Sequence, residues 1–533
     1  MANYASTMHF PESILLAALV VGLIGCSETA EQQTPAKKQP VATSNSDAQP
    51  SPPDRKAAPT YGNPSSAKDG IDYVKRNGAI FENWPMPKAV VVLSGALDGF
   101  IEPCGCTGLE NQKGGLSRRH TLITGLKKRG WPIVTLDMGG VIRRFGPQAT
   151  IKYRYGLAAL RTIGYDAIGL GQGELKLPGQ EVLLAQQQEG KMQPFVSANV
   201  ASTEFKEFGF RVPYKVAVAA GQRFGVTTIL GDQRGRALQN PDFQWTTAID
   251  ALPAVVKKLE AEKCDYRVLL VSGPLDEAQH VARQFPQFDV VVAAGDSDPP
   301  SPKATLIRGT KSHFVELSHK GMYVGVLAFY DDPQTPLRYQ RVPLDGRFAD
   351  SDDMRAIMTE YQDELKQTGL AGLGLQPIPH PTGRTFVGSA TCGECHTKAF
   401  EIWEKTPHAH ATKPTLTALK PARHHDPECL SCHVTGWEPQ EYYPFKSGYL
   451  NFEKTASMRA NGCENCHGPG SEHVAAENGD IDADETMLDK LRAAMRLTKA
   501  AAPDNCSRCH DLDNSPHFNF KTYWPKVEHL GID

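Results

Sequence analysis

One short pattern, Cys-x-x-Cys-His, occurs four times in the last part of this 533-residue chain. A spacing of three residues places both sulfurs on one side of a helical turn, where they can bond the two vinyl groups of one haem. The histidine that follows offers an imidazole to the iron. The cysteines are Cys392, Cys395, Cys429, Cys432, Cys463, Cys466, Cys506 and Cys509, and the histidines are His396, His433, His467 and His510. The pattern predicts four covalently attached c-type haems.

Two other uses of paired cysteines fit this pattern less well. A zinc ribbon needs Cys-x-x-Cys pairs but no histidine after each of them. Histidine occupies 17 of 533 positions, so four such histidines arise by chance on the order of once in a million. A disulfide framework explains neither the histidines nor the constant spacing. Four haems in so short a region leave little polypeptide for a separate core, so we expect short helices and irregular loops wrapped around the haems.

The N-terminus predicts export, which haem attachment also requires because it takes place outside the bacterial cytoplasm. An apolar run over residues 14–25 is too short to span a bilayer and suits a signal peptide. It leads into Leu23-Ile24-Gly25-Cys26, which resembles a lipoprotein lipobox with Cys26 as the lipidated residue. The alternative is a buried helix with a chance cysteine. Residue 27 is Ser rather than Asp, which favours the outer over the inner membrane for a periplasmic lipoprotein.

The region around the motifs resembles the cytochrome c-554 family of tetrahaem electron carriers. The resemblance covers residues 385–512 and includes Thr406-Pro-His408-Ala-His410-Ala and the stretch from Cys463 to His473. It implies mostly low-spin haems with two histidine ligands, and it implies His408 and His473 as distal ligands, with His410 as a further candidate. Outside the motifs, seven histidines compete for the distal positions: His408, His410, His424, His425, His473, His517 and His529.

The interval between the second and third motifs matters for the distal ligands. The family has a distal histidine there, whereas this chain has none between His433 and His467. We therefore expect one haem with an open or differently filled sixth position, for which Met458, Met487 and Met495 are candidates. Packing is the commoner use of methionine.

The pattern of the larger N-terminal part predicts an α/β domain. Apolar stretches at residues 89–93, 132–137, 166–170, 267–273 and 288–295 alternate with helical patterns near 115–129 and 152–163. Antiparallel strands are expected over 312–330 and 338–343, and an amphipathic helix over 351–368. The predicted organisation is a signal peptide at 1–26, a disordered linker at 27–75, an α/β domain at 76–370, a linker at 371–384 and a mainly helical or irregular haem domain at 385–533.

The order of these pieces resembles the metallophosphoesterase domain of 5'-nucleotidases, a layered sandwich. The cues include Gly114-Gly-Leu-Ser-Arg118, Leu136-Asp-Met-Gly-Gly140 and Ser197-Ala-Asn199. Two metal ions in such a site need Asp, His and Asn ligands. Most of those positions have changed in this chain: the sequence has Ala96, Asp98, Gly140, Gly171-Gln-Gly-Glu174, Ser272-Gly273 and Gly295-Asp-Ser-Asp298. We expect no dimetal site, and a domain that serves as a non-catalytic scaffold or as a module that docks a partner or binds a ligand.

Two further thiols, Cys104 and Cys106, follow the first of these positions closely. One intervening residue allows a strained disulfide, a metal-binding pair or a redox role, and Cys264 is the other thiol of this part of the chain. The sequence leaves these uses open.

The balance of charge excludes one class of partner. The chain has 57 Lys and Arg against 60 Asp and Glu, so it lacks the basic excess that nucleic-acid binding needs. The function expected is periplasmic electron transfer between donor and acceptor cytochromes or a membrane quinol-oxidising complex. The alternatives are a redox enzyme that acts on a small nitrogen or oxygen species at an open haem, and an active phosphoesterase with auxiliary haems.

Overall fold

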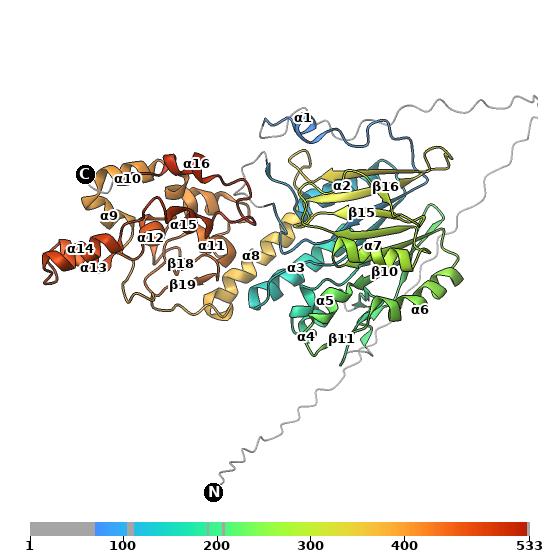
Figure 1. Ribbon diagram of the computed structural model, residues 1–533, viewed down its shortest axis with the longest axis horizontal. Coiled ribbons are helices and arrows are strands. Elements are labelled where there is room, and N and C mark those ends of the chain that lie inside the picture. The colour runs from blue at the N-terminus through green and yellow to red at the C-terminus, as the bar shows by residue number, and fades with distance from the viewer. Residues whose placement is uncertain (1–69, 104–110, 189–190, 205–207, 530–533) are drawn as a thin grey trace, which may run out of the picture. The chain divides into compact units, whose positions relative to one another are not determined.

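The computed structural model describes residues 70–103, 111–188, 191–204 and 208–529. Its N-terminal part contains two mixed β-sheets (Figure 1). The first sheet has the order β17 (Leu337–Pro343), β16 (Tyr323–Phe329), β1 (Ala89–Ser94), β2 (Ile133–Asp137) and β3 (Ala167–Ile168). The second has the order β14 (Thr305–Leu306), β15 (His313–Leu317), β13 (Val290–Ala294), β12 (Tyr266–Ser272), β10 (Gln222–Leu230) and β9 (Lys215–Ala219).

The two sheets pack face to face because alternate side chains of each strand point to opposite sides. In β1, Val91 and Leu93 belong to a buried cluster that also holds Val268 and Leu270 of the second sheet. Their neighbour Val92 points the other way, into a cluster formed with helices. Every residue of β1 is buried, as expected of a strand covered on both faces.

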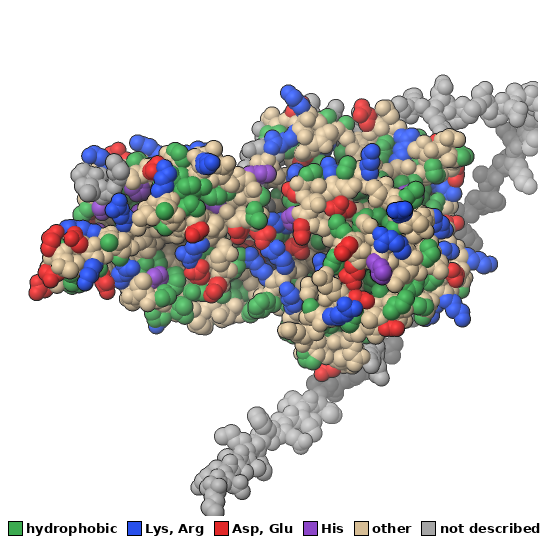
Figure 2. Space-filling model, viewed as in Figure 1, with side chains coloured by type: hydrophobic (Ala, Val, Ile, Leu, Met, Phe, Trp, Pro, Cys, Tyr) green, Lys and Arg blue, Asp and Glu red, His purple; other side chains and the backbone are tan. Residues whose placement is uncertain are grey.

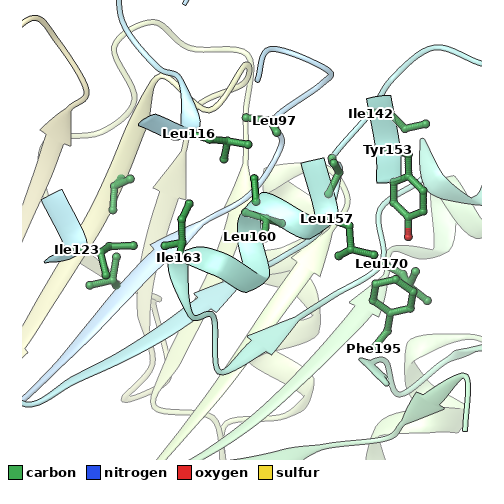
Figure 3. Close-up of a cluster of buried hydrophobic side chains, with 14 of the residues drawn as sticks. Leu97, Leu116, Ile123, Ile142, Tyr153, Leu157, Leu160, Ile163, Leu170 and Phe195 are labelled. Atoms are coloured by element: carbon green, nitrogen blue, oxygen red, sulfur yellow. The ribbon is translucent and has the colours of Figure 1, made fainter. Parts of the chain in front are cut away.

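Helices cover the two outer faces. On the first sheet lie α2 (Leu116–Lys128) and α3 (Pro147–Ile163), and Figure 3 shows Leu157 and Leu160 of α3 in the cluster that they form. On the second sheet lie α6 (Ala248–Ala261) and α7 (Leu275–Gln284). The order of layers is helix, sheet, sheet, helix, which confirms the predicted layered α/β sandwich.

One sequence expectation differs from the structure in the pairing of strands. Residues 312–330 do form two strands, β15 and β16, but the two belong to different sheets. β15 pairs in parallel with β13, with His313 opposite Val290, while β16 pairs antiparallel with β1 and β17. Apolar periodicity marks both as buried strands and carries no information about their partners, which the packing of the sandwich decides.

Shorter elements complete this part of the chain. They are α1 (Tyr73–Asn77), η3 (Glu174–Lys176), α4 (Gly179–Ala185), α5 (Asp232–Arg236), β4 (Gln187–Gln188), β5 (Lys191–Met192), β6 (Phe195–Val196), β7 (Val200–Ser202), β8 (Arg211–Val212) and β11 (Phe243–Trp245). Tyr73 of α1 is buried, and its carbonyl accepts a hydrogen bond from Arg347.

The C-terminal region is mainly helical, and most of its helices are short. They are α9 (Ser389–Cys395), α10 (Thr397–Glu404), η5 (Pro407–His410), η6 (Ala411–Leu416), α11 (Pro427–His433), η7 (Ala456–Met458), α12 (Cys463–His467), α13 (Ser471–Glu477), α14 (Glu485–Ala494), α15 (Ala502–Ser507), α16 (Phe520–Tyr523) and η8 (Trp524–Lys526). One two-stranded sheet joins β18 (Trp437–Glu438) to β19 (Tyr443–Pro444). A small apolar cluster forms beside the second motif and includes Leu430, Val434 and Trp437. In the described parts of the chain, no helix combines the length and apolarity that crossing a membrane requires.

Helix α8 (Asp352–Gly372) connects the two parts of the chain. It packs beside α3, and Met358 and Tyr361 of α8 share a buried cluster with Ile151 of α3 (Figure 1). Near its end, Gly369 has φ 60° and ψ 175°, which interrupts the helix and suits glycine because a side chain is strained there. Leu370 then packs against the apolar cluster beside the second motif.

Candidate haem-binding site

Each Cys-x-x-Cys-His motif lies on a short helix or at its end. Three of the helices, α9, α11 and α12, contain both cysteines of their motif. In the fourth motif α15 ends at Ser507, and the backbone N–H of His510 donates to the carbonyl of Cys506 at 2.9 Å. The geometry therefore brings the two sulfurs and the imidazole of each motif together, as haem attachment requires.

Three of the four motif histidines face a second histidine ring. The ring centroids of His396 and His473 are 6.3 Å apart with an interplanar angle of 21°. His510 lies 6.1 Å from His408, and His467 lies 5.8 Å from His529. Two metal–nitrogen bonds of about 2 Å each, with the half-width of each ring added, span about 6 Å. The three pairs fit an iron held between two imidazoles.

Hydrogen bonds orient these rings. Nδ1 of His433 lies 2.6 Å from the carbonyl oxygen of Ala411, and Nδ1 of His467 lies 2.7 Å from that of Met495. Nδ1 of His510 lies 3.1 Å from Oγ of Ser515. A ring that donates from Nδ1 keeps its Nε2 lone pair for a metal, which is the usual arrangement around metal-binding histidines.

Burial lowers the pKa of several of these imidazoles. It lowers the pKa of His433, and with nearby groups it lowers the pKa of His467 as well. The pKa of His408 falls to about 4 because of burial and of the neighbouring His510 and His433. Only the neutral ring can bind a metal, so the environment favours the ligating form.

The two histidines predicted as distal ligands each face a motif histidine. His473 lies opposite the first motif, and His408 lies opposite the fourth motif although the first is nearer in sequence. His410 is exposed, and it faces no motif histidine among the described residues. His529, opposite the third motif, was not selected from the sequence, because no spacing rule connects it to Cys463.

The second motif differs from the other three. Within the described parts of the chain, no histidine ring faces His433. Met458, a sequence candidate for an open position, is buried in the apolar cluster beside this motif, and the carbonyl of Met495 is the hydrogen-bond partner of His467.

The motifs also lie close to one another. The thiols of Cys392 and Cys463 interact, as do those of Cys432 and Cys509, so the first motif adjoins the third and the second adjoins the fourth. Helices α12 and α15 are in contact and connect the third motif to the fourth.

In the α/β domain, three side chains at positions that the resemblance to 5'-nucleotidases singled out have protein partners. The amide of Asn199 donates to the carbonyls of Leu230 and Thr246 at 2.7 and 3.0 Å. Ser272 accepts from Arg234 at 3.1 Å. Asp98 accepts from the backbone N–H of Lys320 at 3.2 Å, and burial raises its pKa. These three side chains therefore make hydrogen bonds within the α/β domain.

The backbone at this site is also closely packed. Gly140 has φ 78°, and a Cβ there would lie 3.1 Å from Cα of Ala96. An aspartate at this position would therefore be both strained and crowded. Glu174, the last residue of Gly171-Gln-Gly-Glu174, accepts from the backbone N–H of Val141 at 2.6 Å. Burial raises the pKa of Glu174 to about 7.

The remaining predicted sites include one that the structure describes. Cys264 is buried among the side chains of α6 and the second sheet, and burial raises its pKa. Among the described residues no three His, Cys, Asp or Glu side chains gather to hold a metal ion. Cys26, Cys104 and Cys106, together with the predicted signal peptide and most of the linker, lie outside the described residues.

Comparison with known proteins is consistent with the motif geometry. The family model for cytochrome c554 and c-prime matches residues 391–468, which include the first three motifs. Residues 391–468 are therefore similar to this family of c-type cytochromes. Cytochrome c-554 of Nitrosomonas europaea is 33% identical over 147 residues, which are 25% of this chain and 60% of that protein.

The α/β domain is similar to 5'-nucleotidases. The snake venom 5'-nucleotidase of Gloydius brevicauda is 25% identical over 233 residues, 42% of this chain and 39% of that protein. The 5'-nucleotidase precursor of Thermus thermophilus is 20% identical, with a TM-score of 0.44, over 61% of this chain and 68% of that one. This chain thus spans about 60% of the curated cytochrome and 39% of the curated nucleotidase.

We expect Glu174→Gln to remove a pH dependence of stability. The folded-state pKa of about 7 lies above the ordinary value of 4.5, so stability is highest below the unfolded pKa and falls as pH rises through 7. At 1.36 kcal/mol per unit, the loss is at most about 3 kcal/mol. Urea unfolding at pH 5 and pH 8 measures it: the variant should be the more stable at pH 8 and about equal at pH 5. An equal pH dependence in both proteins would contradict the expectation.

We expect His473→Ala to leave the first haem without a distal histidine. Electron paramagnetic resonance of the oxidised protein should then show one more high-spin haem than the wild type, with the number of covalent haems unchanged. His410→Ala is the matched control, because that ring is exposed and should leave the spectrum unaltered. A change in the control alone would reverse the assignment.

Proposed function

We propose that this protein is an exported tetrahaem c-type cytochrome that transfers electrons between redox partner proteins. The observation that carries the proposal is the set of three histidine pairs, each about 6 Å apart and each including a motif histidine. The similarity to the cytochrome c554 family indicates a c-type electron carrier. The number of four haems is supported by four complete motifs, the last of which lies outside the family match.

The residues of this chain would attach, orient and enclose the haems. The eight motif cysteines would form the thioether bonds, and the motif histidines with the facing His408, His473 and His529 would offer their ring nitrogens to the irons. Bound haem supplies a one-electron carrier whose potential depends on its ligands, their hydrogen bonds and burial. Carbonyl acceptors such as those of Ala411 and Met495 make the imidazole more basic.

The α/β domain is proposed to be a non-catalytic scaffold. The partners of Asn199, Ser272 and Asp98 and the tight packing at Gly140 support this role. The periplasmic location, an anchor at Cys26 and preference for the outer membrane rest on the sequence alone. On the face drawn in Figure 2, Lys and Arg side chains are interspersed with Asp and Glu, which supports protein rather than nucleic-acid partners.

A second candidate function rests on the second motif. His433 faces no second histidine among the described residues, so its haem could keep a free position. A free position would allow reduction or oxidation of a small nitrogen or oxygen species, and the protein would then be an enzyme.

The spectra of the haem-loaded protein distinguish an electron carrier without an open haem from an enzyme with one. Full-length protein produced with haem-maturation machinery should contain four covalent haems, with three low-spin signals and one high-spin signal, and the reduced form should bind one carbon monoxide. Fewer than four covalent haems would overturn the tetrahaem proposal. Four low-spin haems without carbon monoxide binding would overturn the enzyme candidate.

The alternative of an active phosphoesterase predicts turnover. We expect no hydrolysis of nucleotides or aryl phosphates above the buffer rate, with or without added Mn²⁺ or Zn²⁺, because the ligand positions are lost or occupied. Asp98→Ala is the control for contamination. Activity that depends on metal and disappears in this variant would refute the scaffold role.

A further inference from the structure

The α/β domain touches the cytochrome region at the helix that carries the second motif. Glu428, directly before Cys429 on α11, forms an ion pair with Lys152 of α3. Arg144 lies 3.7 Å from the same carboxylate. The side chain of Asp426, which caps α11, accepts from Gln148 of α3 at 2.7 Å. A cation or donor from the α/β domain therefore meets each acid at the start of this helix.

These contacts are partly buried. Lys152 is 6% exposed and Asp426 is 5% exposed, whereas the side chain of Glu428 is 28% exposed. Burial works against the charge on Lys152, yet its pKa is raised because Glu428 and Asp426 lie nearby. Burial likewise opposes ionisation of Glu428, but Lys152 and Arg144 outweigh it and lower its pKa. Both partners are charged, and removing one would leave the charge of the other only partly compensated.

A second group of contacts lies after the fourth motif. Asp513, three residues beyond His510, forms ion pairs with Arg143 and with Lys320, the latter at 3.2 Å. Nζ of Lys320 also donates to the carbonyls of Leu512 and Asp513. The backbone of Lys320 holds Asp98, so these cations come from the part of the α/β domain where the metal ligands were lost.

The charges are distributed in nearly the same way in all of these ion pairs. The α/β domain contributes cations and the cytochrome region contributes acids; the exception is the pair of Arg423 with Glu102, which runs the other way. A charge fixed beside a haem changes its potential, because reduction adds one negative charge. The face of the α/β domain that carries Lys152, Arg143 and Lys320 would thus influence the haem potentials, which a scaffold alone would not do.

We propose that this face of the α/β domain is a permanent docking surface for the second and fourth motifs, and that Lys152 sets the reduction potential of the second haem through its ion pair with Glu428. The inference rests on the proposed tetrahaem function. It assigns to the α/β domain a partner within the same chain and a role in tuning the electron carrier.

The test compares potentials in the full-length haem-loaded protein by optical redox titration. Lys152→Met removes one positive charge and leaves Glu428 with Arg144 alone, so one of the redox steps should move to lower potential, by about tenfold in the ratio of reduced to oxidised haem, or about 59 mV. Glu428→Gln leaves the cation unpaired, and the same step should move upward. In the double variant the potential should return toward that of the wild type. Lys152→Arg keeps the positive charge and should have the potential of the wild type.

Two further variants separate electrostatics from general damage. Arg144→Gln replaces Lys152→Met if that variant does not fold. It should lower the same potential by a smaller amount. Arg223→Gln removes an exposed ion pair with Glu262 inside the α/β domain, and it should change no potential. Shifts of the same sign in the acid and base variants, or no shift, would overturn the proposal. Fewer than four haems in the wild type would instead refute the tetrahaem function on which it rests.

Discussion

A histidine that serves an iron must present one bare ring nitrogen in a fixed direction and must stay uncharged. Burial supplies the second condition, as the lowered pKa of His408 shows. The carbonyls of Ala411 and Met495 supply the first by accepting from Nδ1 of His433 and His467. The short helices of the C-terminal region follow from this requirement, because many loops must bring histidines from distant parts of the chain to about 6 Å from one another. A long regular helix would present few of them.

The α/β domain owes its stability to its apolar layers. They lie on both sides of each sheet, and none of that stability needs a metal ion. Asn199 and Ser272 make hydrogen bonds within the domain, and the backbone of Lys320 donates to Asp98. The side chains of Lys152 and Lys320 are suited to bind acids, which the cytochrome region presents in Glu428 and Asp513.

The sequence was informative where the chemistry is local. A haem motif needs five consecutive residues, so all four could be found. Periodicity located the strands and helices of the first sheet, but in the second sheet it did not mark β9, β10, α6 or α7. His473 could be chosen because the resemblance to the cytochrome c-554 family implies a distal histidine shortly after the third motif. His529 could not, since its position opposite His467 depends on the path of the last helices. The pairing of β15 with β13 was missed for a similar reason, because a buried strand has the same pattern in either sheet. The ion pair of Lys152 with Glu428 joins residues 276 positions apart, and no pattern in either segment predicts it.

The interruption of α8 at Gly369 places the joint between the two parts of the chain inside a helix rather than in a loop. Residues before it are fixed by α3, and Leu370 just after it is fixed by the apolar cluster beside the second motif. A helix completes one turn in about 3.6 residues. The length of α8 up to Gly369 therefore sets the orientation of the haem region relative to the α/β domain. Insertions near this glycine would therefore rotate the acids of α11 away from their cations, so evolution can lengthen the surface loops of this protein far more freely than this one helix.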